Sequence, residues 1–308
     1  MELPGTSGFQ RCLEALHAAF PALRVDSALP IDEGWANYVL EINGELVFRF
    51  SRRSAIRLKV AAELRFLPKL SKVVTLPVPS YDYIAGNTDD SGPMFVGYPK
   101  IPGQPMFLDE STSTARRKVA EQLGAFISAL HRFSVAIAVA SGILSEPADA
   151  WYREYEDRYR KVTQPILPLL KRTQRSNIAR AWESFLSNRA NFAFPPVFVH
   201  RDLGGDNVLW DITSGAITGV IDWEAASLGD PAIDFANDFN IARENQRAFT
   251  DMMLSSYEGV VDDRFRERVH FYSQEGPIHA ILFGLESNQQ WLVNNGLKTL
   301  EETYFSPS

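Results

Sequence analysis

The first hundred residues carry a pattern of hydrophobic and polar positions that is typical of short strands. Two runs rich in β-branched and aromatic residues, 38–42 and 45–50, are separated by Asn43-Gly44. Asn-Gly between two such runs is a strong hairpin signal, because both turn positions need a positive φ. We therefore predict a β-hairpin at this point of the chain.

A helical pattern follows the hairpin. Apolar residues recur at helical spacing from Ile56 to Leu67, which predicts a helix that ends at Pro68. The apolar stretches 73–78 and 94–98 predict two further strands. The predicted order of elements is therefore strand, hairpin, helix, strand, strand.

Beyond residue 99 the pattern becomes mainly helical. The segment 99–105 holds three prolines and one glycine, and we predict that it connects two lobes. A short β-like island over 196–222 interrupts the helical part. The spacing of apolar residues predicts helices over 114–133, 148–159, 176–188, 243–257, 263–272 and 277–294.

The β-like island places polar side chains at the ends of apolar strands. One strand ends at His200, and Asp202 lies on the loop just after it. Asn207 begins a second strand, and a third strand delivers Asp222 at its end. Two carboxylates and one amide oxygen thus converge from strand ends and loops. Oxygen ligands at this density suit Mg²⁺, which binds one or two carboxylates together with phosphate oxygens.

Composition narrows the class of protein further. The chain has 308 residues, 45% of them hydrophobic, and a formal net charge of −7. These values exclude a mainly disordered chain and argue against a nucleic-acid partner, which would need a basic surface. Cys12 is the one cysteine, which excludes an internal disulfide. The sequence shows neither a secretion signal nor a membrane-spanning stretch, so we expect a cytoplasmic monomer without a membrane partner.

The spacing of the polar residues matches a known catalytic loop. His200-Arg201-Asp202 followed by Asn207 fits the kinase pattern His-Arg-Asp-x-x-x-x-Asn. Asp222 stands where kinases place the metal-binding aspartate of Asp-Phe-Gly. The further motifs that support the match lie at 97–103, 221–224 and 229–235. With them the chain resembles the aminoglycoside phosphotransferase family of small-molecule kinases, and within it the 2″-phosphotransferases most of all.

A protein kinase agrees less well with the sequence. Only seven residues separate Asp222 from Asp230, which is too few for an activation loop. The usual glycine-rich loop is replaced by 32–37, which contains one glycine. The chain also lacks Gly-Lys-Ser/Thr, which excludes a Walker-type nucleotidase.

The resemblance implies an α+β, bilobal protein-kinase-like fold. A β-rich N-lobe over 1–98 would bind the nucleotide, and a mostly helical C-lobe over 99–308 would carry catalysis and acceptor binding. The implied reaction moves the γ-phosphoryl of ATP or GTP, with Mg²⁺, to a hydroxyl of a small molecule. The expected acceptor is an aminoglycoside, which would make the protein an antibiotic-resistance kinase.

Three alternatives remain at this point. One is a macrolide kinase, which would show an apolar acceptor cleft. Another is a metabolic kinase of the same fold acting on a sugar or an amino alcohol. The third is an inert, nucleotide-binding pseudokinase, against which the retained Asp202, Asn207 and Asp222 argue.

The resemblance also assigns roles to the residues of the island. Asp202 is the expected base that accepts the proton of the acceptor hydroxyl, and Asn207 and Asp222 are the expected metal ligands. His200 is expected to be structural, bonding backbone near Asp222. Arg201 departs from the family, and we expect it to form a structural ion pair.

For the nucleotide, the resemblance places Arg49 where the family has a phosphate-binding lysine, with Glu63 as its ion-pair partner. Arginine keeps the positive charge of lysine, but its reach differs. The connector that begins near Tyr98 should present backbone groups to the purine. Lys100 and Ile101 are the expected donors there, because the proline before them has no N–H.

For the acceptor, the resemblance points to the loop after Asp222 and to the C-terminal helices. Carboxylates there would suit a polyamine sugar by charge complementarity. The structural alternatives are a helix cap for Asp234 and a core position for Trp291. The candidate acceptor residues are Asp234, Asp238, Glu244, Glu275 and Trp291.

Overall fold

The computed structural model describes residues 8–32, 37–86, 92–109, 111–144, 149–236, 238–241 and 243–305, without the side chains of 32, 243, 244 and 301–305. The chain forms two compact units. Unit 1 comprises Met1–Pro105, Ala136–Ile143 and Asn207–Ala225, and unit 2 comprises Met106–Val135, Leu144–Asp206 and Ala226–Ser308. The loop predicted to replace a glycine-rich loop, 32–37, lies mostly outside the described residues.

Unit 1 is built on a five-stranded antiparallel sheet with the order β1-β2-β3-β5-β4. Its strands are β1 (Ala28–Asp32), β2 (Asn37–Ile42), β3 (Leu46–Ser51), β4 (Tyr83–Ala85) and β5 (Phe95–Pro99). Asn43 and Gly44 between β2 and β3 have φ angles of 57° and 72°. The predicted hairpin is therefore confirmed, together with the positive φ values that its turn requires.

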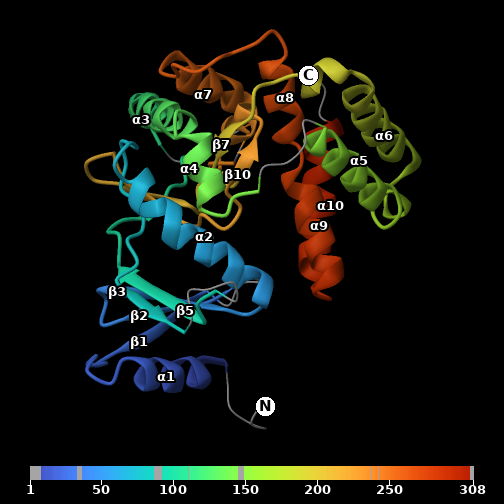
Figure 1. Cartoon of the computed structure of the whole chain (residues 1–308). Helices are drawn as coiled ribbons and strands as arrows, with labels where there is room; N and C mark the ends of the chain where they lie inside the picture. The colour runs from blue at the N-terminus through green and yellow to red at the C-terminus, as the bar shows by residue number, and fades with distance from the viewer. Residues whose placement is uncertain are drawn as a thin grey trace. The chain divides into compact units, whose positions relative to one another are not determined.

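A helix covers each face of this sheet (Figure 1). The helices are α1 (Gly8–Ala19) and α2 (Ser54–Leu70). Leu16 of α1 packs in one cluster with Phe48, while Val60 of α2 packs on the other face with Val96. Because successive side chains of a strand point to opposite faces, Arg49 is directed toward α2 where Phe48 is directed toward α1.

Two local predictions for unit 1 are wrong. Helix α2 continues past Pro68 to Leu70, because one missing N–H in the last turn interrupts little of the helix. The segment 73–78 forms turns and irregular chain in place of a strand. Pro77 lies in it and has no N–H to donate to a ladder, and its carbonyl instead accepts the N–H of Val220 at 2.9 Å.

A second, three-stranded sheet belongs to the same unit. It has the order β6-β8-β9, formed by β6 (Gln104–Pro105), β8 (Val208–Asp211) and β9 (Ala216–Val220). Gln104 pairs with Trp210, although about a hundred residues separate them along the chain. The compact unit reaches Pro105 and includes 207–225, whereas the sequence predicts an N-lobe over 1–98. Helix α4 (Val135–Ala140), which we did not predict, lies almost entirely in this unit.

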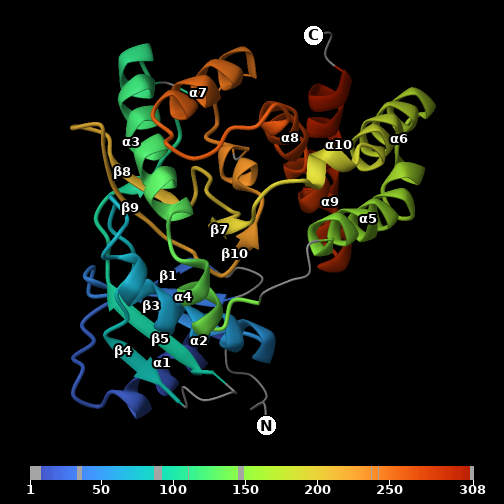
Figure 2. The same cartoon turned by 45° about the horizontal axis from the view of Figure 1, so that its top comes forward.

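Unit 2 is mainly helical (Figure 2). Its helices are α3 (Ser113–His131), α5 (Ala150–Thr163), α6 (Arg172–Ser187), α7 (Arg243–Ser255), α8 (Phe265–Tyr272), α9 (Gly276–Glu286) and α10 (Gln290–Phe305). Helix α3 lies beside α7, and α9 beside α10. The single helix predicted over 277–294 is wrong, because Asn288 adopts a φ of 57° and separates α9 from α10. A short antiparallel pair, β7 (Val197–Val199) with β10 (Ser227–Gly229), supports the loop described below.

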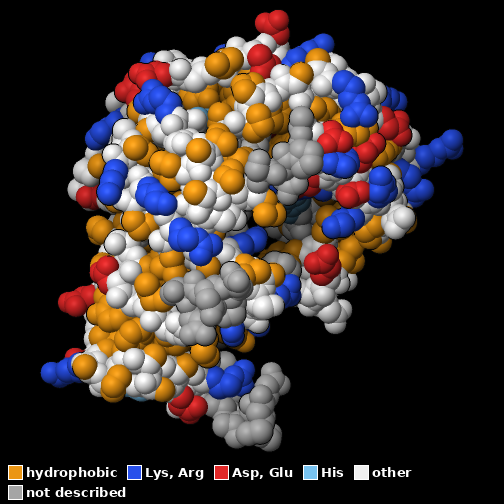
Figure 3. All heavy atoms as spheres, viewed as in Figure 1, with side chains coloured by type: hydrophobic (Ala, Val, Ile, Leu, Met, Phe, Trp, Pro, Cys, Tyr) orange, Lys and Arg blue, Asp and Glu red, His pale blue; other side chains and the backbone are white. Residues whose placement is uncertain are grey.

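Aromatic side chains fill the core of unit 2 where α5, α6 and α8 meet. The rings of Phe185 and Phe271 stack with their centroids 3.7 Å apart, and Tyr155 and Trp182 pack around them. Acidic and basic side chains intermingle on the surface over α5 and α6 (Figure 3). None of the described helices combines the length and apolar character that a membrane crossing requires.

Candidate active site

Arg49 on β3 and Glu63 on α2 form a buried ion pair inside unit 1. Arg49 Nη1 donates to Glu63 Oε2 at 3.0 Å, and the two residues are 5% and 0% exposed. Arg49 lies on the face of the sheet that α2 covers, which brings the guanidinium to the helix. The predicted pairing is therefore confirmed, and it repeats the strand-to-helix Lys–Glu pair of kinases with arginine in place of lysine.

Three further side chains surround the Arg49 guanidinium. Nη1 also donates to the Tyr81 hydroxyl at 3.0 Å, and Nη2 donates to Asp222 Oδ1 at 3.2 Å and Glu224 Oε2 at 3.4 Å. Tyr81 in turn donates to Glu63. Four of the five N–H donors of this guanidinium thus have partners within the unit.

Glu224 extends the cluster to the start of β2. Its Oε2 accepts the side-chain N–H of Asn37 at 3.0 Å, and Asn37 is the last residue of the glycine-containing loop. Sequence reasoning placed Glu224 in a motif without giving it a role; its position two residues after Asp222 was the available signal. Tyr81 lies in an irregular segment, and nothing in the sequence pattern marks it.

Burial and charge act against each other in this cluster. Burial alone would lower the pKa of the Arg49 guanidinium, but the charge of Glu63, and after it those of Tyr81 and Asp222, raises the pKa well above its ordinary value. Burial raises the pKa of Glu63 against the opposing effect of Arg49. Burial and the charge of Asp222 also raise the pKa of Glu224 to about 7. A proton on Glu224 therefore relieves the excess of carboxylates over the single guanidinium.

The two predicted metal ligands, Asn207 and Asp222, belong to the same unit and to adjacent segments. The N–H of Ile221 donates to the carbonyl of Asn207 at 2.9 Å, just beyond the paired strands β8 and β9. Asp222 adopts a φ of 60°, a left-handed conformation that costs energy for a residue with a Cβ. Its side chain is 41% exposed, and Arg49 bonds one of its oxygens. Because Arg49 bonds Oδ1 and the side chain is partly exposed, Oδ2 of Asp222 can bind another ligand.

The connector predicted to meet the purine continues the ladder of the sheet for one residue past β5. The N–H of Lys100 donates to the carbonyl of Glu45 at 2.7 Å, so Lys100 is not the purine donor we predicted. Its side chain binds Glu41 at 2.6 Å. The Tyr98 ring is 5% exposed and packs edge-on against Tyr81, which leaves Tyr98 only its backbone for a ligand. Ile101 remains a predicted donor.

Unit 2 carries the predicted catalytic loop, which begins at the end of β7. Asp234 fixes its backbone: Oδ2 accepts the N–H of His200 at 3.0 Å and Oδ1 accepts that of Arg201 at 2.7 Å. His131 Nε2 lies 3.1 Å from the same Oδ2. His200 is fully buried, and its Nδ1 accepts the N–H of Asp202 at 3.3 Å. The structural role of His200 and its bond to backbone near Asp222 stay predictions.

Asp202, the predicted base, is exposed at the tip of this loop. Its carbonyl accepts the N–H of Gly204 at 3.0 Å, which closes a tight turn. The N–H of Gly205 donates to the carbonyl of Asp238 at 2.9 Å, which ties the loop to a neighbouring segment. Burial, followed by the charges of Asp202 and Asp238, raises the pKa of Asp206. Asp206 is therefore a second carboxylate near Asp202 that sequence reasoning did not single out.

Arg201 forms the ion pair that the sequence analysis predicted. Its guanidinium donates to Glu154 of α5 and lies over the Trp151 ring, 4.7 Å from the centroid. Neither α5 residue was singled out from the sequence, because Glu154 lies 47 positions before Arg201 and gives no local sign that it meets the loop.

The structure corrects two of the predicted acceptor residues. Asp234 is 0% exposed and holds backbone N–H groups, so the predicted contact with the acceptor is wrong and its role is structural. Glu275 is 6% exposed, and its Oε2 accepts Arg158 Nη1 at 2.6 Å, so its carboxylate already has a cationic partner. Asp238 is exposed, and Trp291 is 66% exposed and thus outside the core. The side chain of Glu244 lies outside the described residues.

Asp234→Asn is expected to lower the free energy of unfolding of unit 2 by about 1–3 kcal/mol. An amide in this position would turn its NH₂ toward a backbone N–H, leaving one buried donor of His200 or Arg201 without an acceptor. Urea unfolding followed by tryptophan fluorescence measures the change. Asp238→Asn, at an exposed carboxylate of the same segment, is the matched control and should leave the midpoint unchanged. Equal midpoints for both variants would contradict the role given to Asp234.

The chain is similar to known phosphotransferases. The model of a family described as phosphotransferase enzymes matches residues 27–270. Viomycin phosphotransferase of Streptomyces vinaceus is 30% identical over 213 residues, which cover 68% of this chain and 71% of the relative.

Solved structures match almost the whole chain. The GDP and kanamycin complex of APH(2″)-IIia has a TM-score of 0.83 and 25% identity, covering 95% of this chain and 98% of that one. Macrolide 2′-phosphotransferase MphH of Brachybacterium faecium has a TM-score of 0.70 and 20% identity, covering 96% and 99% of the two chains. The second likeness shows the fold alone. Together they confirm the predicted α+β, kinase-like fold class.

Proposed function

The chain belongs to the phosphotransferase enzyme family, and from that premise we propose that it moves the γ-phosphoryl of ATP or GTP to a hydroxyl of an aminoglycoside. The observation that carries this proposal is the buried cluster in which Arg49 is bonded to both Glu63 and Asp222. The Arg49 guanidinium thus links Glu63 on α2 with Asp222 after β9. In kinases, phosphoryl transfer needs both the strand-to-helix ion pair and the metal-binding aspartate to be in position.

Asp202 is the proposed base. It stands on an exposed loop tip whose backbone is held by Asp234 and His200. An exposed carboxylate on such a loop can accept the proton of the acceptor hydroxyl as that oxygen meets the γ-phosphorus. Most of the rate enhancement would come from positioning and charge neutralisation, since phosphoryl transfer needs little covalent help.

Asn207 and Asp222 fit a magnesium ion by the chemistry of their donor atoms. One carboxylate and one amide oxygen, set on adjacent segments, are hard ligands of the kind that Mg²⁺ prefers. Among the described residues, no group of three or more His, Cys, Asp or Glu side chains could hold a metal ion. Waters and the phosphate oxygens of a bound nucleotide would supply the remaining ligands. When bound, the ion would neutralise charge on the β- and γ-phosphates.

The main role of Arg49 at this site would be to position Asp222, and binding a phosphate would be secondary. With four N–H donors already bonded and the residue 5% exposed, only Nε–H remains for a nucleotide. The guanidinium fork instead fixes Oδ1 of Asp222 in its left-handed turn. In this proposal, arginine replaces the family's lysine because its planar fork reaches several acceptors at once.

One solved structure supports the choice of acceptor, since the structure with the TM-score of 0.83 contains GDP and kanamycin. The 30% identical relative is named for viomycin, which makes viomycin a second acceptor to test. Of the predicted acceptor residues, Asp238 and Trp291 present exposed side chains that could meet such a molecule. GDP in that complex also makes GTP a donor to test beside ATP.

An acceptor panel tests the proposal directly. The protein, Mg²⁺ and either ATP or GTP are mixed with kanamycin, viomycin, a macrolide or an amino alcohol, and products are followed by mass spectrometry. We expect one phosphoryl group to appear on kanamycin. Product on viomycin, the macrolide or the amino alcohol alone would replace the aminoglycoside in this proposal. Nucleotide binding without product from any acceptor would favour the inert alternative, and reactions without acceptor control for hydrolysis.

A further inference from the structure

Arg201 holds an unusual backbone conformation in the catalytic loop. Its φ is 71°, in the left-handed region that residues with a Cβ rarely occupy. Such a conformation persists only where surrounding contacts determine it. The N–H of Arg201 is fixed by Asp234, and the residue that follows is the proposed base, Asp202. The contacts of the Arg201 side chain are therefore expected to influence the position of the Asp202 carboxylate.

Helix α5 presents two groups to the Arg201 guanidinium. Trp151 and Glu154 are three residues apart, so they lie on the same face of the helix. Trp151 provides a flat ring for the guanidinium to stack on, and Glu154 provides the carboxylate that accepts its N–H. Gly229 leaves the space for that ring, since a Cβ at this position would lie 2.2 Å from it.

The Glu154 carboxylate remains charged and is held from both sides. Its Oε1 also accepts Arg158 Nη2 at 2.9 Å, and Arg158 is bonded in turn to Glu275, the residue just before α9. Burial alone would raise the pKa of Glu154, but Arg201 and Arg158 lower it below its ordinary value. The Glu154 side chain is 37% exposed and that of Arg201 is 18% exposed, so solvent screens the pair only in part.

We propose that Glu154 is a positioning residue of the catalytic loop. Its negative charge holds the Arg201 guanidinium, and Arg201 in turn positions the neighbouring Asp202. In protein kinases, phosphorylation of an activation loop supplies negative charge that orders the catalytic machinery. This chain has seven residues between Asp222 and Asp230 and no room for such a loop. The α5 carboxylate supplies the charge permanently, so the loop is ordered without a modification. This inference rests on the proposed function.

Glu154→Gln tests the proposal by removing the charge while keeping the size of the side chain. We expect kcat to fall roughly 10- to 100-fold, which is the range for losing a charge-assisted hydrogen bond. The KM for nucleotide should stay within about twofold of the wild-type value, because Arg49, Glu63 and Asp222 belong to the other unit. Glu154→Asp keeps the charge and should recover part of the loss.

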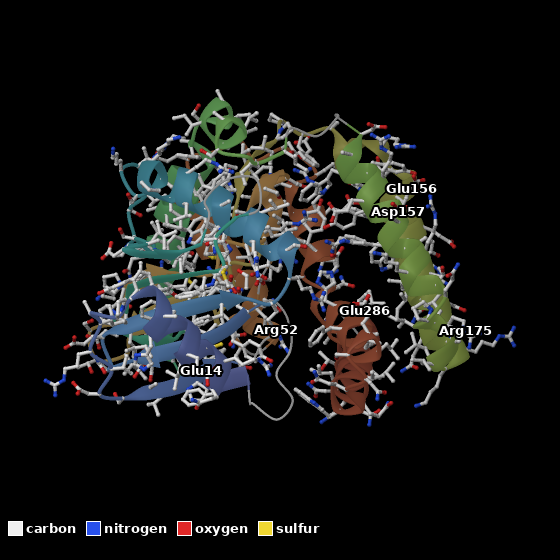
Figure 4. The ribbon with its side chains drawn as sticks, turned by 60° about the horizontal axis from the view of Figure 1, so that its bottom comes forward. Glu14, Arg52, Glu156, Asp157, Arg175 and Glu286 are labelled. Atoms are coloured by element: carbon white, nitrogen blue, oxygen red, sulfur yellow. The ribbon has the colours of Figure 1, made fainter. Side chains whose placement is uncertain are left out.

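Asp157→Asn is the matched control on the same helix. Asp157, labelled in Figure 4, also pairs with an arginine, Arg160, but its side chain is 62% exposed. This variant should keep the wild-type kcat. Because Glu154 is inferred to act through Arg201, adding Glu154→Gln to Arg201→Met should lower kcat no further than Arg201→Met alone. Additive losses, or a Glu154→Gln kcat within twofold of wild type, would overturn the proposal.

A readout that needs no acceptor separates this proposal from the proposed function. Amide hydrogen exchange of the segment 200–204 should be faster in Glu154→Gln than in the wild type or in Asp157→Asn. Unchanged exchange in this segment would overturn the positioning role even if turnover changes. Faster exchange in a protein that phosphorylates no acceptor would support the link between Glu154 and the loop and refute the proposed function instead.

Discussion

Asp202→Asn is expected to lower kcat by roughly a thousandfold, within the range that general acid–base catalysis contributes. Asparagine has the same shape as aspartate but cannot accept the proton of the acceptor hydroxyl. The backbone bonds of Asp202, from its N–H to His200 and from Gly204 to its carbonyl, do not involve the side chain. Because asparagine keeps these backbone bonds and the size of the side chain, nucleotide affinity and thermal stability should stay at wild-type values.

Asp206→Asn is the control for this experiment. Asp206 is a second carboxylate close enough for the charge of Asp202 to raise its pKa, and both residues are exposed. If it only contributes charge near the loop, its loss should change kcat far less than the loss of Asp202. A large loss in Asp206→Asn together with an active Asp202→Asn would move the role of base from Asp202 to Asp206. Steady-state kinetics with a phosphorylated acceptor decides between them.

The parts of the fold that sequence could predict are those encoded by neighbouring residues. The hairpin follows from Asn43-Gly44, whose positive φ values are a local requirement. The catalytic loop follows from the spacing of His200, Asp202 and Asn207, because a short loop between two strands keeps such residues in order. The Arg49–Glu63 pair required the resemblance, since the two residues lie 14 positions apart along the chain, one on a strand and one on a helix.

The parts that could not be predicted depend on contacts between distant residues. Asp234 carries a charge, and its segment gives no sign that it is buried beneath the loop 33 residues upstream. The N–H of Lys100 is already bonded to the carbonyl of Glu45, because the ladder between β3 and β5 continues one residue past Pro99. The unit boundary likewise depends on the pairing of Gln104 with Trp210, which no local pattern reveals.

Replacing Arg49 should have the largest effect on the stability of unit 1. Arg49→Met is expected to lower the free energy of unfolding by about 3–5 kcal/mol, the range for removing one partner of a buried ion pair. Glu63 would be left 0% exposed without its counter-charge, and its Oε1 already lacks a hydrogen-bond partner. Turnover should be lost as well, since nothing would then fix Oδ1 of Asp222. Urea unfolding and the acceptor assay measure the two effects.

The pH dependence of this loss distinguishes a missing charge from a packing defect. Removing Arg49 takes away the influence that opposes burial, so the pKa of Glu63 should rise further in the folded state. For an acid whose folded pKa exceeds its unfolded value, stability is lost as the pH rises and regained as the pH falls. The difference between wild type and Arg49→Met should therefore shrink as the pH approaches about 4 to 5, where Glu63 also protonates in the unfolded chain. Adding Glu63→Gln to Arg49→Met should recover stability at pH 7, whereas a deficit that is the same at every pH and unrelieved by Glu63→Gln would show that the Arg49 guanidinium mainly fills space.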